Sequence, residues 1–272
     1  MKTVADALAA ARACGLDRLD AQLLLAHVMT QSRSWLLAND DACLNETQAQ
    51  LMHAFIDRRA GGEPVAYLIG EKEFYGLPLS VSPAVLIPRP DTETLVDWAL
   101  ALMRSLPPPN SVLDMGTGSG AIALALKHNL PSADVTALDA SAGALAVAID
   151  NAARLQLDVH FLLSDWWERV IGQRFNLIVS NPPYVAGDDE HLIALQHEPQ
   201  MALTPGGDGL GALRHIVAGA PAHLHDGGWL LLEHGHDQAP AVAGMLTQLG
   251  FGFVTTRHDL AGIPRCTGGR WG

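Results

Sequence analysis

The chain has 272 residues, 49% of them hydrophobic, which suffices for a substantial core and suggests two domains, since typical domains run to roughly 100–200 residues. With 17 basic and 29 acidic residues its net charge is −12, which argues against a protein that grips the phosphates of duplex DNA. Three widely spaced cysteines, no signal peptide and no apolar run long enough to span a bilayer together indicate a cytoplasmic protein with reduced thiols.

The beginning of the chain predicts a helical domain over residues 1–72. Thr3 is placed to cap a helix that runs to about Arg12, and residues 20–29 form a second apolar stretch. These segments are short and amphipathic, so we expect them to pack into a small bundle.

A third helix is predicted from a capping box. Asn45 and Gln48 stand three residues apart at its expected start, and Gly61 marks its end. The face turned to the core is expected to carry four apolar side chains: Leu51, Met52, Phe55 and Ile56.

The pattern changes after the helical domain. Residues 73–87 are strand-like, with Gly76 and Pro78 marking a hairpin that links two domains. From residue 88 strands and helices alternate, which predicts an α/β catalytic domain over 88–272 with a Rossmann-like, mainly parallel sheet and an antiparallel edge. The strands are expected near 111–114, 135–138, 159–163, 177–180 and 229–233, followed by an edge pair near 252–258 and 270–272.

A proline-rich segment opens the catalytic domain. Pro88 and Arg89 stand just ahead of a glycine loop and are predicted to wall a substrate pocket. The segment also reads as a rigid linker in which Asp91 or Thr92 caps the helix that begins near Glu93. We expect both interpretations to hold.

The glycine loop indicates a nucleotide cofactor. A buried strand over 111–114 runs into Gly116-Thr117-Gly118-Ser119-Gly120, where glycines let the backbone turn tightly and approach a ligand. Asp139 ends the next strand, where a carboxylate can accept both ribose hydroxyls. The spacing G-x-G-x-G argues against NAD, whose loop reads G-x-G-x-x-G. Asp114 suits an S-adenosylmethionine loop instead, since a carboxylate can lie near the cationic end of that cofactor.

The strand over 159–163 ends in a possible adenine contact. Asp165 is placed to accept from the adenine amino group and Trp166 to pack on the ring, because ligands bind at the carboxyl ends of such strands. The alternative is a core pair formed by Trp166 and Trp167 beside a solvated Asp165.

The tetrapeptide Asn181-Pro182-Pro183-Tyr184 follows an apolar strand and predicts methyl transfer to an amide or amino nitrogen. The Asn181 side-chain oxygen and the Pro182 carbonyl can each accept one N–H, and Tyr184 offers a flat face for the substrate group. The prolines preorganise these acceptors. Asn181 is also assigned to the cofactor contacts. By itself the tetrapeptide is equally consistent with an ordinary proline turn.

Two further features are weaker. Glu198 and Pro199 either shape a lid over the pocket or merely connect elements. Several residues could in principle bind a metal, but methyl transfer from a sulfonium needs no Lewis acid and we predict no metal site. These residues are His223, His225, His234, His236 and Asp237.

Taken together, these motifs resemble the bacterial HemK/PrmC family, the protein-(glutamine-N5) methyltransferases of peptide chain release factors. The similarity extends over nearly the whole chain, and the segment Pro-Arg-Pro-Asp-Thr-Glu at 88–93 narrows it to this family. Further matching stretches are Gly62 to Gly70, Phe74 to Gly76, Val85 to Ile87, Glu198-Pro199, Gly207 to Leu210, Leu232 to Gly235, and Asp259 to Gly262 with Arg265.

The resemblance implies a class I S-adenosylmethionine-dependent methyltransferase that modifies the glutamine side chain of the Gly-Gly-Gln motif in class 1 release factors. Gly116 to Gly120, Asp139 and Trp166 would hold the cofactor, and Asn181 to Tyr184 the glutamine. The helical domain would dock the protein substrate, although its apolar faces are expected mainly to form its own core.

Two other functions share part of this pattern. An adenine-N6 methyltransferase of RNA or DNA would carry the same cofactor motifs, but it needs a basic target-binding surface, which this composition argues against. A non-enzymatic scaffold that binds cofactor and partner is not supported, because every motif residue is present.

Overall fold

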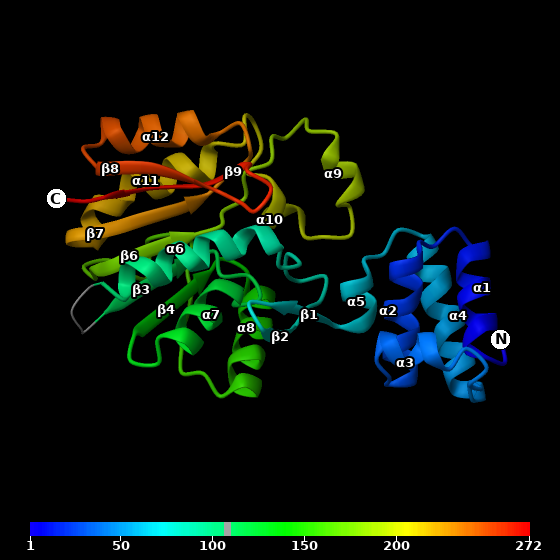
Figure 1. Ribbon diagram of the computed structural model, residues 1–272. Helices are drawn as coiled ribbons and strands as arrows, with labels where there is room; N and C mark the ends of the chain where they lie inside the picture. Colours follow the sequence, from blue (N-terminus) through cyan, green and yellow to red (C-terminus); the bar gives the residue numbers. More distant parts are fainter. Residues whose placement is uncertain (106–109) are drawn as a thin grey trace. The chain divides into compact units, whose positions relative to one another are not determined.

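A computed structural model describes residues 1–105 and 110–272 of the chain. The chain divides into two compact units, Met1–Glu71 and Lys72–Gly272 (Figure 1). The first unit is all-helical. The second contains every residue of the pocket described below.

Two predicted caps are confirmed in the first unit. Thr3 Oγ1 accepts from the Asp6 amide while the Asp6 carboxylate accepts from the Thr3 amide, and Asn45 and Gln48 form the same reciprocal pair. The helices are α1 (Val4–Ala13), α2 (Arg18–Met29), α3 (Arg33–Ala38), α4 (Glu46–Ala60) and α5 (Val65–Ile69). The short helices α3 and α5 were not predicted.

The first unit has its own apolar core, which includes Met52, Phe55 and Ile56 of α4. Leu51 was predicted to join them and does not, since its side chain is 39% exposed. Leu51 lies at the edge of the apolar face of α4, and only the other three side chains belong to the buried core.

The second unit opens with a hairpin of β1 (Glu71–Phe74) and β2 (Leu77–Ser80). Tyr75 and Gly76 both have positive φ, 51° and 79°, as a two-residue hairpin turn requires. The strand pattern expected as far as residue 87 is realised only to Ser80.

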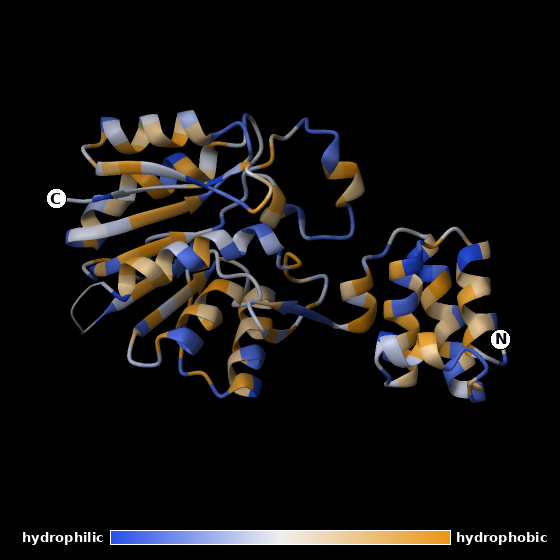
Figure 2. Ribbon diagram, viewed as in Figure 1, coloured by the Kyte–Doolittle hydropathy of each residue, from blue (hydrophilic) through white to orange (hydrophobic). Residues whose placement is uncertain are grey.

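The main sheet has seven strands in the order β5-β4-β3-β6-β7-β9-β8, parallel from β5 to β7 and antiparallel at the β9 and β8 edge. In Figure 2, hydrophobic colours run along the arrowhead half of β7. The strands are β3 (Ser111–Met115), β4 (Asp134–Asp139), β5 (His160–Leu163), β6 (Phe175–Ser180), β7 (Leu224–Glu233), β8 (Gly252–His258) and β9 (Pro264–Arg270).

The predicted position of the last strand was wrong, since β9 covers Pro264–Arg270 rather than 270–272. Its glycines resemble a loop in sequence but serve packing. A Cβ on Gly268 would lie 2.4 Å from Leu231 Cδ2 and 2.6 Å from the Leu230 carbonyl oxygen. Only glycine therefore fits at this position of β9, which pairs with Leu231 of β7.

Helices cover both faces of this sheet, giving three layers. Leu177 and Val179 of β6 face one apolar cluster while Ile178 between them faces the other. Figure 1 shows α7 and α8 on one side and α11 and α12 on the other. The longer helices are α6 (Glu93–Met103), α7 (Ala121–Asn129), α8 (Ala142–Leu155), α11 (Gly211–His223) and α12 (Ala239–Gln248); the short ones are η1 (Pro90–Thr92), α9 (His191–Ala194) and α10 (Gln200–Leu203).

The parallel register brings the strand ends to one edge of the sheet. Met115 at the end of β3 pairs with Leu138 on one side and Ser180 on the other. The residues that follow these strands therefore meet at the carboxyl edge, where doubly wound sheets bind ligands. Within the described ranges, no helix is long and apolar enough to cross a membrane.

Candidate active site

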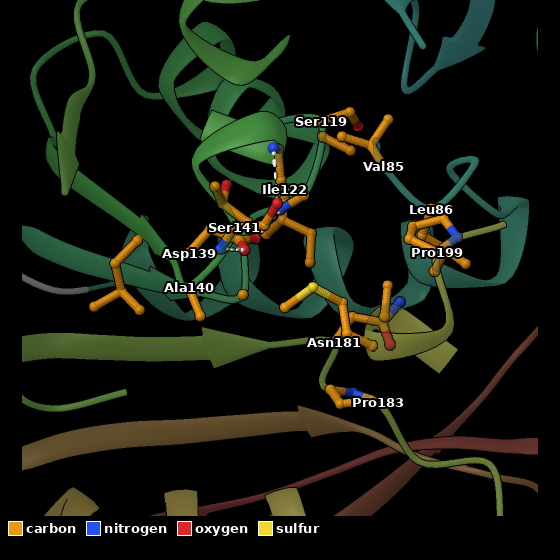
Figure 3. Close-up of a pocket in the computed structure, with 18 of the residues that line it drawn as sticks. Val85, Leu86, Ser119, Ile122, Asp139, Ala140, Ser141, Asn181, Pro183 and Pro199 are labelled. Carbon is orange, nitrogen blue, oxygen red and sulfur yellow. Dashed lines mark hydrogen bonds between the residues drawn. The ribbon is translucent and has the colours of Figure 1, made fainter. Parts of the chain in front are cut away.

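A cavity of about 280 Å³ opens at this carboxyl edge. In Figure 3, Asp139, Ala140 and Ser141 lie together on one side of it and Leu86 and Pro199 on the other, with Asn181 between them. The wall is drawn from segments far apart in the sequence: 84–92, 116–122, 138–144, 164–166, 181–183 and 199–202.

The glycine loop forms the wall next to β3. Gly116, Thr117, Gly118 and Ser119 line the cavity. Gly118 has φ 57°, and a Cβ built on it meets no atom within 4 Å, so its backbone faces open space. Gly120 does not line the cavity; its Cβ would lie 3.0 Å from Leu124 Cδ1, so it serves the packing of α7.

Asp114 lies beneath this loop rather than in the cavity wall, although the sequence suggested a place near the cationic end of a cofactor. Its Oδ2 accepts from Thr117 Oγ1 at 2.6 Å and from the Ala123 amide at 3.1 Å. Burial raises the pKa of Asp114 to about 7. The side chain thus anchors the loop to the start of α7.

Asp139 presents its carboxylate at the end of β4. Oδ2 accepts from the Gly118 amide at 2.9 Å and Oδ1 from the Ser141 amide at 2.8 Å, and burial raises the pKa of this group. Each carboxylate oxygen has a second lone pair, so both can still accept from a ligand. A fixed pair of acceptors beside an open glycine backbone fits the ribose of a nucleoside cofactor.

The Trp pair after β5 divides between two roles. Asp165 and Trp166 line the cavity, and the Trp166 backbone, at φ 47°, is held by a hydrogen bond from Ser164 Oγ to its carbonyl at 2.9 Å. Trp167 instead stacks on His223, with ring centroids 4.6 Å apart. The structure thus places the first member of the pair in the pocket and the second in the packing beside α11.

The Asn181-Pro182-Pro183-Tyr184 segment begins where β6 ends. Asn181 and Pro183 line the cavity, whereas Pro182 and Tyr184 are not among its lining side chains. Asn181 Nδ2 donates to Thr92 Oγ1 at 3.2 Å.

Tyr184 is mostly buried against the second apolar cluster, and its hydroxyl donates to Glu233 Oε1 at 3.4 Å. Burial raises the pKa of this tyrosine. Its carbonyl accepts from Gln238 Nε2 at 3.0 Å, which fixes the end of the tetrapeptide. The role of its ring toward a substrate stays a prediction.

The proline-rich segment forms the far wall. Pro88 and Arg89 line the cavity. Buried Glu198 accepts from the Ile87 amide at 3.0 Å and forms an ion pair with Arg89. Pro199, which follows, also lines the cavity. Glu198 therefore clamps two sides of the pocket together, which sequence reasoning left open.

Thr92 occupies the N-cap position of α6, which begins at Glu93 as predicted, but neither the Thr92 nor the Asp91 side chain makes a capping hydrogen bond. Asp91 pairs with Arg265 at 3.0 Å, and the Thr92 hydroxyl accepts from Asn181 Nδ2 and lies beside the Glu233 carboxyl group, whose charged form it favours. Both side chains are drawn away from the helix end by partners that the local sequence does not contain.

Sequence reasoning also missed Glu233 as a part of this site. It ends β7 beside the Asn181 segment and is 1% exposed. An acid at the end of a buried strand was the available signal, since such a group needs partners. Among the described residues, no group of three or more His, Cys, Asp or Glu side chains is arranged to hold a metal.

The doubly wound sheet, the glycine loop followed by Asp139, and the Asn-Pro-Pro-Tyr segment at the adjacent strand end define a class I S-adenosylmethionine-dependent methyltransferase. Residues 94–210 match the Methyltransferase small domain family and residues 1–70 the PrmC N-terminal domain family.

Full-length relatives narrow this class. The chain is 49% identical over 258 residues to the release factor glutamine methyltransferase of Bordetella pertussis, covering 94% of this chain and 95% of that protein. It is 48% identical over 267 residues to that of Xylella fastidiosa, covering 97% of each. The chain therefore belongs to the release factor glutamine methyltransferase family.

More distant solved structures share the fold. One is the 16S rRNA N2 G1207 methyltransferase of Thermus thermophilus in complex with AdoMet and guanosine, with a TM-score of 0.54 and 18% identity, covering 74% of this chain and 50% of that one. A methyltransferase of Pyrococcus furiosus also has a TM-score of 0.54 and 18% identity, over 72% of this chain and 90% of that one.

Proposed function

We propose that this protein transfers a methyl group from S-adenosylmethionine to the side-chain amide nitrogen (N5) of the glutamine in the Gly-Gly-Gln motif of class 1 peptide chain release factors, supporting translation termination. The observation that carries the proposal is the Asn181 amide, which lines the cavity while its Nδ2 is held by Thr92. Its Oδ1 is then left to accept an N–H from a substrate amide.

The chemistry asks for orientation more than for proton transfer. An amide nitrogen is a poor nucleophile because its lone pair is delocalised. Asn181 Oδ1 would accept one of its N–H bonds, and the carbonyl of Pro182, which stands between the cavity-lining Asn181 and Pro183, would accept the other. These contacts would hold the nitrogen in line and favour a localised lone pair. The bound S-adenosylmethionine supplies an electrophilic methyl carbon from its sulfonium. The nitrogen gives up one proton to water after it is methylated, so no side-chain base is needed.

The cofactor contacts follow from the same wall. Asp139 would accept from the ribose hydroxyls, Asp165 from the adenine amino group, and Trp166 would pack on the adenine ring; all three line the cavity. Gly116 to Ser119 would pass close to the cofactor, because Gly116 and Gly118 both leave open space where a side chain would otherwise stand. Pro88, Arg89 and Pro183 would shape the substrate side.

The partners and location proposed from the sequence accompany this function. The helical domain over residues 1–72 docks the release factor, and no duplex nucleic acid is bound, because the chain carries a net charge of −12. Three cysteines without a disulfide among them agree with a cytoplasmic protein.

Methyl-labelled S-adenosylmethionine tests the proposal. The purified protein is incubated with a release factor, with the same factor carrying alanine in place of the Gly-Gly-Gln glutamine, and with RNA and DNA. Label on the intact factor alone supports the proposal. Equal label on both factors, or label on nucleic acid, contradicts it and favours methylation of a different nitrogen.

A further inference from the structure

The Asn181 amide can take two orientations of almost the same shape. One turns Oδ1 toward a substrate and the other turns Nδ2 toward it. Only the first accepts an N–H from a glutamine amide, since the second would set donor against donor. Something in the protein must therefore choose between them.

The Thr92 hydroxyl lies where it can make this choice. It is 3.2 Å from Asn181 Nδ2, and it also lies beside the Glu233 carboxyl group, whose charged form it favours. Thr92 is 4% exposed and Glu233 1% exposed, so water cannot freely replace either contact. A hydroxyl has one proton and an ionised carboxylate can only accept. The Thr92 proton therefore points to Glu233, and its lone pair is left for Asn181.

We infer that Glu233, acting through Thr92, is a positioning residue that holds the Asn181 amide with Nδ2 turned inward and Oδ1 turned to the pocket. This inference rests on the proposed function, because it assigns the orientation that a glutamine amide requires. The three groups come from the ends of β6 and β7 and from the η1 turn, segments joined only by the fold.

The groups around Glu233 determine its protonation state. Arg265 of β9, which is itself paired with Asp91, favours the charged form, as do the Thr92 and Tyr184 hydroxyls; Asp91 opposes it. Cys266 of β9 is a further titratable neighbour. Burial dominates and raises the pKa of Glu233 to about 7. Its Oε2 is buried without a hydrogen-bond partner among the described residues.

Protonation of Glu233 would reverse the direction of the hydrogen bonds from Glu233 through Thr92 to Asn181. A neutral Glu233 can donate to Thr92, and Thr92 can then donate to Asn181 Oδ1, which permits the unproductive amide orientation. The carboxylate is present above a pH of about 7 and is lost as the pH falls through that value. Turnover should fall in the same direction.

Three variants test the inference. Thr92→Val removes the hydroxyl at nearly constant shape, Thr92→Ser restores it, and Glu233→Gln replaces a pure acceptor with a group that can also donate. The matched control is Thr136→Val, at a buried threonine of β4 outside this network. Each is assayed for kcat with a release factor and for S-adenosylmethionine affinity by calorimetry.

Thr92→Val and Glu233→Gln should lower kcat about 10- to 100-fold, while cofactor affinity stays within about 2-fold of the parent value. Thr92→Ser and Thr136→Val should stay near the parent. The parent kcat should fall as the pH drops through about 7, and that dependence should disappear in Glu233→Gln.

Parent-like kcat in both Thr92→Val and Glu233→Gln, or an unchanged pH profile in Glu233→Gln, would overturn the inference. Cofactor binding reports whether each variant is folded. If Thr92→Val does not fold, the kcat and the pH profile of Glu233→Gln test the inference. A parent protein that methylates no glutamine would instead refute the proposed function.

Discussion

Glu198 accepts a hydrogen bond from the backbone amide of Ile87, 3.0 Å away and 111 residues earlier in the chain. The bond joins the two segments that wall the pocket opposite the cofactor loop, and the same carboxylate pairs with Arg89. The shape of the substrate side of the pocket therefore depends on one buried carboxylate.

Glu198→Ala should leave the Ile87 amide unpaired and lower the free energy of unfolding by about 1–3 kcal/mol. Arg89 is 37% exposed, so its lost ion pair adds little to that loss. KM for the release factor should rise more than the Kd for S-adenosylmethionine. Glu198→Gln keeps an acceptor for the Ile87 amide, so its free energy of unfolding and its KM should lie between those of the parent and of Glu198→Ala. Denaturant unfolding measures the loss of stability, and steady-state kinetics measures the change in KM. Equal values for the parent, Glu198→Ala and Glu198→Gln would contradict the role of Glu198 in shaping the pocket.

Asn151 of α8 joins the β1-β2 hairpin to the glycine loop. Its Oδ1 accepts from the Ser80 amide at 2.7 Å, and its Nδ2 donates to the Ser80 and Ser119 carbonyls at 3.0 and 2.9 Å. Because the side chain is fully buried, Asn151→Ala should cost about 2–4 kcal/mol of folding free energy.

Asn151→Asp is a sharper test of the same contact, since an ionised Asp cannot donate to the two carbonyls. Asn151→Asp should lower the free energy of unfolding at least as much as Asn151→Ala does. Asn129→Ala is the control, because among the described residues that side chain donates within its own helix, to the Ala125 carbonyl, and its loss should cost less than about 1 kcal/mol. Thermal unfolding measures all three, and a mild Asn151→Ala would mean that the hairpin is held by other contacts.

Gly118→Ala should weaken S-adenosylmethionine binding about 10-fold or more. The substitution strains a backbone at φ 57° and adds a methyl group to the cavity wall, in space that is open in this structure. Gly15→Ala is a matched control: Gly15 also has positive φ, 83°, with no atom within 4 Å of a Cβ, but it lies in the first unit. If both variants bind the cofactor equally well by calorimetry, Gly118 does not face the cofactor.

Features that depend on neighbouring residues could be predicted from the sequence. The capping boxes at Thr3 and Asn45 are complete within four residues, and both helices begin there. The glycine loop directly follows β3 and Asp139 ends β4, so the alternation of strands and helices was enough to bring them together.

The remaining features depend on distant residues. Thr92 was read as a helix cap because its partners, Asn181 and Glu233, lie far along the chain. The position of β9 could not be predicted locally, because Gly268 is needed for close contact with Leu230 and Leu231 of β7. In both cases tertiary packing overrides a local signal.

The most direct measurement of the central claim is a tandem mass spectrum of the Gly-Gly-Gln peptide from a release factor treated with S-adenosylmethionine and either the parent protein or Asn181→Ala. We predict one methyl group on the glutamine side-chain nitrogen with the parent, about 100-fold less with the variant, and similar cofactor affinity for both. A methyl group on another residue, or equal glutamine methylation by the two proteins, would contradict the account.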